Sequence, residues 1–252
     1  MADFVPPTLA SETIFNIGSF EVRNTLITSI MTLLILLIVG LLIRRKKYAL
    51  VPSGIQNVAE ALIGGMLGFF AGIVGDDKKT KKFLPLVTTI FFYVLISNWM
   101  GLLPGFGSIG FKEMEEGHEI FVPIFRSTYA DVNMTFALAA ISVIATQIFG
   151  FSMLGFKGYG GKFFVNPLKN PIGTFVGILE LVSEFAKMVS FTFRLFGNIF
   201  AGEVLLLVMA FLVPFIAPIP FYGLEIFVGF IQALVFAFLT LVFLKIATTS
   251  HH

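Results

Sequence analysis

The stretch LITSIMTLLILLIVGLLI occupies residues 26–43 and contains no Asp, Glu, Lys or Arg. A helix needs about 20 apolar residues to cross the hydrocarbon core of a bilayer. Lipid offers no hydrogen-bond partner to a backbone that is neither helical nor part of a closed barrel. The stretch therefore predicts a transmembrane helix. Two further runs, 83–103 and 136–156, also lack these charged residues and predict two more conventional spans.

The composition of the whole chain agrees with a membrane protein. Of 252 residues, 57% are hydrophobic and 13% are charged, whereas soluble domains have about 45–50% apolar and about 25% charged residues. The chain has no Cys, which excludes disulfides and a cysteine nucleophile. The net charge of +2, without a basic domain, argues against a nucleic-acid partner. We expect residues 1–252 to form one all-α polytopic domain in a lipid bilayer.

Lysine and arginine are concentrated in the connections on one side, which the positive-inside rule assigns to the cytoplasm. The rule places the N-terminal segment 1–25 outside and the C-terminus inside. Segment 54–73 is apolar but lies between two basic clusters, so we expect a helix at the cytoplasmic surface. The acidic cluster 113–119 is expected to be a solvated outer loop. The basic residues used are Arg44, Arg45, Lys46, Lys47, Lys78, Lys79, Lys81, Lys82, Lys157, Lys162 and Lys169.

Two long apolar segments, 172–213 and 221–247, complete the chain. A helix over 172–213 would be about 63 Å long, twice the ~30 Å hydrocarbon core. The segment is therefore either two spans or one helix lying far from the membrane normal, and the residues leave both open. Pro214, Pro218 and Pro220 predict a turn between the two segments.

Ionisable residues inside these segments are costly unless they face protein or a water-filled cavity. Glu203 lies on the face of its segment opposite Arg194, while Glu225 and Gln232 share a face of the last segment. These polar sets indicate an interrupted ion path. Alternatively, Glu184 and Lys187 form a simple pair within the helix, or Lys187 extends to the headgroups. The residues that share one face, within about 80° of one another, are Glu180, Glu184, Lys187, Arg194 and Asn198.

The stretch FRLFGN at 193–198, followed by AGE at 201–203, closely resembles the signature of subunit a of the F-type ATP synthase. ISNW at 96–99, ADVNMT at 130–135 and IQAL at 231–234 also resemble motifs of that family, in the family's order. The resemblance extends from about residue 20 to the end. It implies a non-catalytic, cofactor-free stator subunit of the bacterial plasma (inner) membrane. Its C-terminal segments would form a long tilted helical hairpin. The implied partners are the subunit c ring, subunit b of the peripheral stalk and the remaining synthase subunits.

The resemblance also implies roles for individual residues. Arg194 matches the essential arginine that separates two ion half-channels; being permanently charged, it would force the ion, by default a proton, to ride the ring. Some relatives have His at position 225, so a Glu203–Glu225 carboxylate pair here implies different proton sharing. The outer half-channel would contain Asn198, Glu203, Glu225 and Gln232, the inner one Glu180, and the outer entrance Asp131 and Asn133.

An antiparallel hairpin with its turn near 213–214 would place Glu203 opposite Glu225 and Arg194 opposite Gln232. Arg194 and Glu203 would be about 13.5 Å apart along the helix, too far for direct neutralisation. We therefore expect two separate polar layers, with Gln232 hydrogen-bonded to the guanidinium.

Two other classes of protein have buried charges in membranes. A secondary transporter or channel with a charge relay would show internal repeats or paired broken helices, and no convincing repeat is visible. A membrane-embedded enzyme would need a nucleophile–base pair or a metal cluster. The only histidines are residues 118, 251 and 252, outside the predicted spans.

Overall fold

The computed structural model describes residues 11–45, 54–115, 118–163, 170–214 and 216–249. Within these ranges, six helices are long and apolar enough to cross a membrane, which confirms an all-α polytopic fold. Lys46, Lys47, Lys169, the first ten residues and the terminal histidine pair lie outside the described residues. The helices are α1 (Asn24–Arg45), α2 (Ile55–Val74), α3 (Asp77–Met100), α4 (Val132–Phe163), α5 (Pro171–Leu212) and α6 (Pro218–Ala247).

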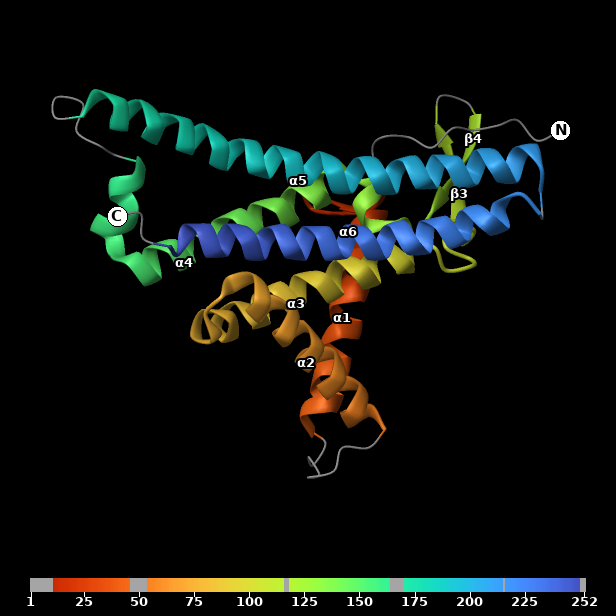
Figure 1. The fold of residues 1–252 in the computed structure, drawn as a ribbon. Coiled ribbons are helices and arrows are strands. Elements are labelled where there is room, and N and C mark those ends of the chain that lie inside the picture. The colour runs from red at the N-terminus through yellow and green to blue at the C-terminus, as the bar shows by residue number, and fades with distance from the viewer. Residues whose placement is uncertain (1–10, 46–53, 116–117, 164–169, 215, 250–252) are drawn as a thin grey trace.

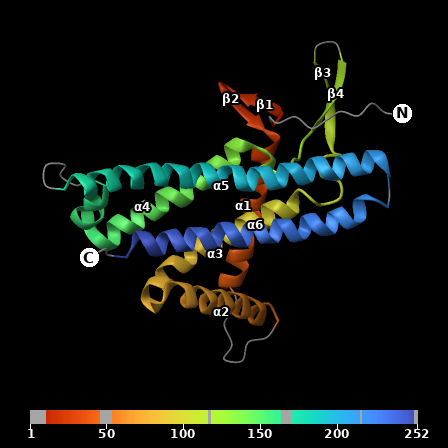
Figure 2. The same ribbon diagram turned by 45° about the horizontal axis from the view of Figure 1, so that its top comes forward.

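Helices α5 and α6 lie side by side and antiparallel in both views of the fold (Figures 1 and 2). Helix α4 runs along α5, α3 packs along α6, and α1 crosses the layer steeply. Segment 172–213 is thus one continuous helix of 42 residues, not two spans. Pro218 and Pro220 lie in the first turn of α6, where a missing N–H costs nothing, rather than in the connection itself.

The packed face of α1 is polar and its free face is apolar. Its buried residues are Asn24, Thr25, Thr28, Ser29 and Thr32, which share one helical face. Thr28 and Thr32 return hydrogen bonds to carbonyls one turn back, and Ser29 hydrogen-bonds the Tyr93 hydroxyl at 2.6 Å. Small polar residues allow close helix packing in membranes. The leucine-rich remainder of α1 is exposed, as expected of a lipid-facing surface.

The core lies between α3, α4, α5 and α6. Phe83, Val87 and Val94 of α3 are fully buried, as are Leu241 and Leu244 of α6. Their spacing of three to four residues puts each set on one face of its helix. This packing fixes the middle of the α5–α6 pair against the rest of the chain.

Helix α4 bends at Gly155, whose φ of 73° and ψ of 168° are not helical. Glycine adopts a positive φ without the steric cost that a Cβ imposes. After the bend the chain folds back, and Tyr159 packs its ring against Gly150, where any Cβ would overlap it. The Tyr159 hydroxyl donates to Gln147 at 2.7 Å.

Two short hairpins were missed from the sequence. Strands β1 (Thr13–Ile17) and β2 (Phe20–Arg23) pair ahead of α1, within the expected outer segment 1–25. Strands β3 (Gly110–Glu115) and β4 (His118–Pro123) pair across the region 113–119, so this region forms a hairpin and not the expected loop. Strand formers such as Phe111, Phe121 and Val122 favour this pairing. A 3-10 turn, η1 (Thr128–Ala130), then leads into α4.

Segment 54–73 forms helix α2, which ends at Gly75 in the left-handed conformation. Phe70 and Val74 are buried in the common core. The helix is long and apolar enough to cross a membrane by composition, so its place at the cytoplasmic surface stays a prediction.

Candidate functional site

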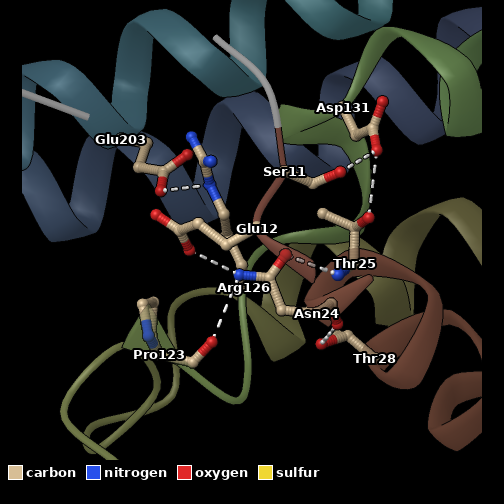
Figure 3. Close-up of polar contacts among 9 residues, drawn as sticks. All are labelled: Ser11, Glu12, Asn24, Thr25, Thr28, Pro123, Arg126, Asp131 and Glu203. Atoms are coloured by element: carbon tan, nitrogen blue, oxygen red, sulfur yellow. Dashed lines mark hydrogen bonds and ion pairs between the residues drawn. The ribbon is translucent and has the colours of Figure 1, made fainter. Parts of the chain in front are cut away.

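A cavity of about 400 Å³ opens where α5, α6 and the end of α3 meet the connection between β4 and η1. Glu203 of α5 and Glu225 of α6 both line it. A third charged side chain, Arg126, enters from the connection (Figure 3). The cavity therefore brings together two carboxylates expected from the sequence and one arginine that was not.

Arg126 forms an ion pair with Glu203. Its Nε donates to Glu203 Oε1 at 3.1 Å, and only 5% of the arginine side chain is exposed. The other carboxylate oxygen, Glu203 Oε2, is buried without a hydrogen-bond partner. None of the sequence motifs assigned a role to Arg126. Its place in the apolar stretch PIFRS, just ahead of ADVNMT, was the available signal.

Glu225 is buried and lies directly over Gly202 of α5. A Cβ at position 202 would overlap the carboxyl group of Glu225, so only glycine leaves room for it. Glu203 and Glu225 share the cavity as expected, but the partner of Glu203 is Arg126. In the described part of the chain, Glu225 has no ion pair or side-chain hydrogen bond.

The end of α3 holds α6 in place beside Glu225. Asn98 Nδ2 donates to the carbonyl of Gly229 at 2.9 Å, and Trp99 Nε1 donates to that of Ile226 at 3.1 Å. The buried oxygens Asn98 Oδ1 and Ser127 Oγ lack a protein partner, as does Glu203 Oε2. All three residues line the cavity. Such a set of unsatisfied oxygens suits ordered water.

Asp131, expected near the outer entrance, is buried in a network beside the cavity (Figure 3). Its carboxylate accepts hydrogen bonds from Ser11 Oγ at 2.5 Å, Thr25 Oγ1 at 3.1 Å and the Asn133 backbone N–H at 2.8 Å. Asp131 thus caps α4 and ties the N-terminal segment and α1 to it. The side chain of Asn133 is exposed.

Arg194 lies exposed on α5. Its Nη2 contacts Ser190 Oγ at 3.4 Å, and Asn198 donates to the Arg194 carbonyl at 2.9 Å. The expected hydrogen bond from Gln232 to the guanidinium was wrong, because the arginine extends toward the preceding turn of its own helix. Within the described ranges, Arg194 has no ion pair.

The other end of α5 carries a second polar cluster. Glu180 forms an ion pair with Lys162 of α4. Glu184 pairs with Lys187 at 2.6 Å and accepts from Gln147 at 2.9 Å. Of the alternatives for Lys187, the structure shows the pair within the helix, with the ammonium 4.7 Å from the centre of the Phe243 ring.

Comparisons with known proteins agree with this architecture. The sequence profile of the family described as ATP synthase A chain matches residues 25–245. The ATP synthase subunit a of Campylobacter jejuni subsp. doylei is 37% identical over 215 residues, 85% of each chain. That of Campylobacter concisus is 34% identical over 225 residues, 86% of this chain and 87% of its own. That of Moorella thermoacetica is 30% identical over 231 residues, 92% of this chain and 93% of its own. The chain therefore belongs to the ATP synthase subunit a family.

Proposed function

We propose that this chain couples proton flow to rotation of a subunit c ring, through two half-channels that Arg194 separates. Membership of the family makes it a non-catalytic, proton-translocating membrane subunit that works within the synthase complex. The proposal rests on the exposure of Arg194 and on its lack of an ion pair among the described residues. Arg194 is exposed on α5 without an ion pair in the described part of the chain, whereas carboxylates at both ends of the helix have cationic partners.

An exposed guanidinium on an apolar helix needs a partner outside the chain. Neighbouring side chains of α5 such as Phe193, which is 59% exposed, form an apolar surface. A lone charge facing lipid is strongly unfavourable. A carboxylate on a ring subunit supplies the missing countercharge, and it can be neutral in lipid and ionised beside Arg194. Arg194 thereby promotes release of the proton from each arriving ring carboxyl.

The separation of charges along α5 supports a gate at Arg194. Glu203 lies nine residues beyond it, about 13.5 Å along the helix, and is already paired with Arg126. Among the described residues, no carboxylate pairs with the guanidinium, whose only side-chain hydrogen bond there is with Ser190. Since arginine does not release its proton, it also offers no relay for protons between the two polar clusters.

The cavity with Glu203 and Glu225 is assigned to the outer half-channel, together with Asn198 and Gln232. Asp131 and Asn133 lie toward its entrance. The cluster around Glu180 is assigned to the inner half-channel. In this assignment α5 and α6 lie far from the membrane normal along the ring, α2 lies at the cytoplasmic surface, and the N-terminus is outside. The host membrane is a bacterial plasma membrane, and subunit b of the peripheral stalk and the remaining synthase subunits complete the complex.

The test is Arg194→Ala in the intact synthase, measured in membrane vesicles. We expect an assembled complex that neither pumps protons during ATP hydrolysis nor makes ATP from an imposed proton gradient. Arg194→Lys should be a poor substitute, since lysine lacks the planar fork and can deprotonate when desolvated. Arg23→Ala, at an exposed arginine of β2 paired with Glu21, is the matched control. Normal coupled synthesis by Arg194→Ala would refute the gate. Ion transport by the chain alone, without the synthase, would favour a secondary transporter or channel.

A further inference from the structure

Arg126 is held rigidly on the connection between β4 and η1, which the sequence did not assign to either half-channel. The Ile124 N–H donates to the Ile109 carbonyl at 2.9 Å, and the Pro123 carbonyl accepts from Asn24 Nδ2 at 3.2 Å. On the other side, Ser127 packs so closely on Gly101 that a Cβ there would overlap it. The segment on both sides of Arg126 is therefore anchored to other elements, and the side chain enters the cavity from a defined position (Figure 3).

We propose that Arg126 is a positioning residue for proton transfer: it holds Glu203 as a fixed carboxylate and leaves Glu225 to carry the proton through the cavity. The proposal rests on the proposed function, because it assigns the cavity to a half-channel. It gives Glu203 and Glu225 different roles, whereas the sequence alone suggests two equivalent carboxylates.

The ion pair accounts for the fixed role of Glu203. The guanidinium of Arg126 keeps its proton, and its Nε is bound to Glu203 Oε1. Protonation of Glu203 would leave the buried positive charge of Arg126 without that countercharge, which is costly. Glu203 Oε2 remains free to accept a hydrogen bond from water in the cavity.

Glu225 has the opposite surroundings. It is 7% exposed, and the other charged or titratable residues that line the cavity are Arg126, Glu203 and Tyr222. Glu12 lies beside the cavity and accepts a hydrogen bond from Asn24 Nδ2 (Figure 3). Arg126 already forms an ion pair with Glu203, so a second carboxylate charge in the same small cavity is disfavoured by the like charge of Glu203 and by burial. Glu225 is therefore the carboxyl that binds the proton.

Each transfer moves one proton through Glu225 and leaves the charges of Arg126 and Glu203 unchanged. A proton from water in the cavity binds the Glu225 carboxylate and makes it neutral. It then leaves for an ionised carboxylate of the ring, which restores the Glu225 anion. In the reverse direction of rotation the same two steps run backwards.

The test compares Arg126→Gln with Arg126→Lys in the intact synthase, with ATP synthesis measured against the pH of the outer compartment. For Arg126→Gln we expect a fall in rate on the order of fivefold. We also expect the pH profile to move by about one unit to higher pH, because carboxylates without their countercharge bind protons more tightly. Arg126→Lys keeps a positive charge and should restore most of the profile. Arg23→Gln is the control.

A double variant separates this role from a purely structural one. Arg126→Gln combined with Glu203→Gln removes the ion pair as a neutral unit, so the pH profile of the double variant should return toward that of the unaltered chain. An unchanged profile in assembled Arg126→Gln, or a double variant whose profile stays displaced as far as that of Arg126→Gln, overturns the proposal. If Arg126→Gln does not assemble, Arg126→Lys takes its place in the test. A pH profile of Arg126→Lys that is displaced as far as the profile of Glu203→Gln also overturns the proposal. The Arg194→Ala result is independent, so loss of coupling there with no effect at Arg126 refutes only this inference.

Discussion

The two ends of helix α5 use the same residue types in different ways. At one end, Glu180 and Glu184 pair with Lys162 and Lys187, and the four side chains are 16–23% exposed. At the other end, Glu203 pairs with the buried Arg126 beside a cavity that also contains Glu225. Arg194 lies between them on the exposed face.

The two ends differ in the cation that pairs with the carboxylates, which is lysine near Glu180 and arginine near Glu203. A lysine ammonium is a flexible point charge that can lose its proton when desolvated, whereas a guanidinium stays charged and binds with fixed geometry. Substitutions near Glu203 should therefore affect transport more than equivalent substitutions near Glu180.

The largest effect is expected where both carboxylates of the cavity are removed. Glu203→Gln combined with Glu225→Gln should reduce proton-driven synthesis more than tenfold, since general acid–base groups typically contribute 10²–10⁴-fold. Each single change should slow transport less, with Glu225→Gln the more harmful of the two. Rates in vesicles, normalised to assembled complex, provide the measurement. An unaltered rate in the double variant would place the outer half-channel elsewhere.

A smaller effect should follow from filling the space under Glu225. Gly202→Ala places a methyl group where the Glu225 carboxyl lies, so the carboxyl must move while the helices stay together. We expect a rate loss on the order of threefold, which is less than the full overpacking cost of about 1–3 kcal/mol because the Glu225 side chain can partly move aside. Gly223→Ala in α6, where a Cβ meets nothing within 4 Å, is the matched control. Equal activity of the two variants would show that the position of Glu225 is unimportant.

At the Glu180 end, Lys162→Gln removes the cationic partner of Glu180. We expect about a twofold slower rate and little change in the pH profile, because the flexible lysine ammonium fixes the position of Glu180 less than a guanidinium would. The comparison with Arg126→Gln under the same conditions is the measurement. A larger effect at Lys162 than at Arg126 would reverse the proposed contrast between the ends of α5.

The smallest effect on transport is expected at Asp76, a fully exposed residue outside the apolar segments. Asp76 caps α3 by accepting hydrogen bonds from the N–H groups of Lys79 and Lys78, and the bond from Lys79 is the main reason that its pKa lies below the usual 3.8. A carboxylate whose pKa is lowered by folding stabilises the fold at any pH above its pKa in the unfolded chain. This stabilisation is lost as the pH falls through its pKa in the folded chain. Asp76→Ala should leave transport unchanged.

Hydrogen exchange provides the readout for Asp76. Protection of the Lys78 and Lys79 amides should decrease in Asp76→Ala at neutral pH, while the neighbouring Asp77→Ala should retain it. In the unaltered chain, that protection should decrease as the pH falls below the usual 3.8 and through the lowered pKa of Asp76. Unchanged protection in Asp76→Ala would show that the cap contributes nothing to the end of α3.

Local sequence determined the membrane class, the positions of the helices and the family. Uncharged runs such as 26–43 must become helices in lipid whatever surrounds them, and FRLFGN at 193–198 identified the polar middle of α5. The three prolines at 214, 218 and 220 similarly predicted where α5 turns back into α6. Each of these signals lies within a few residues of the feature that it predicts.

Only the tertiary structure decided which charges meet. Arg126 and Glu203 are 77 residues apart, and no periodicity in either segment connects them. The burial of the polar face of α1 likewise depends on neighbouring helices. So does the formation of α5 as one continuous helix. Gln232 faces Arg194 in a simple hairpin scheme, yet the guanidinium contacts Ser190 of its own helix. An arginine ion pair depends on side-chain direction and on the anchoring of a distant connection, whereas a span depends only on the solubility of its own residues in lipid.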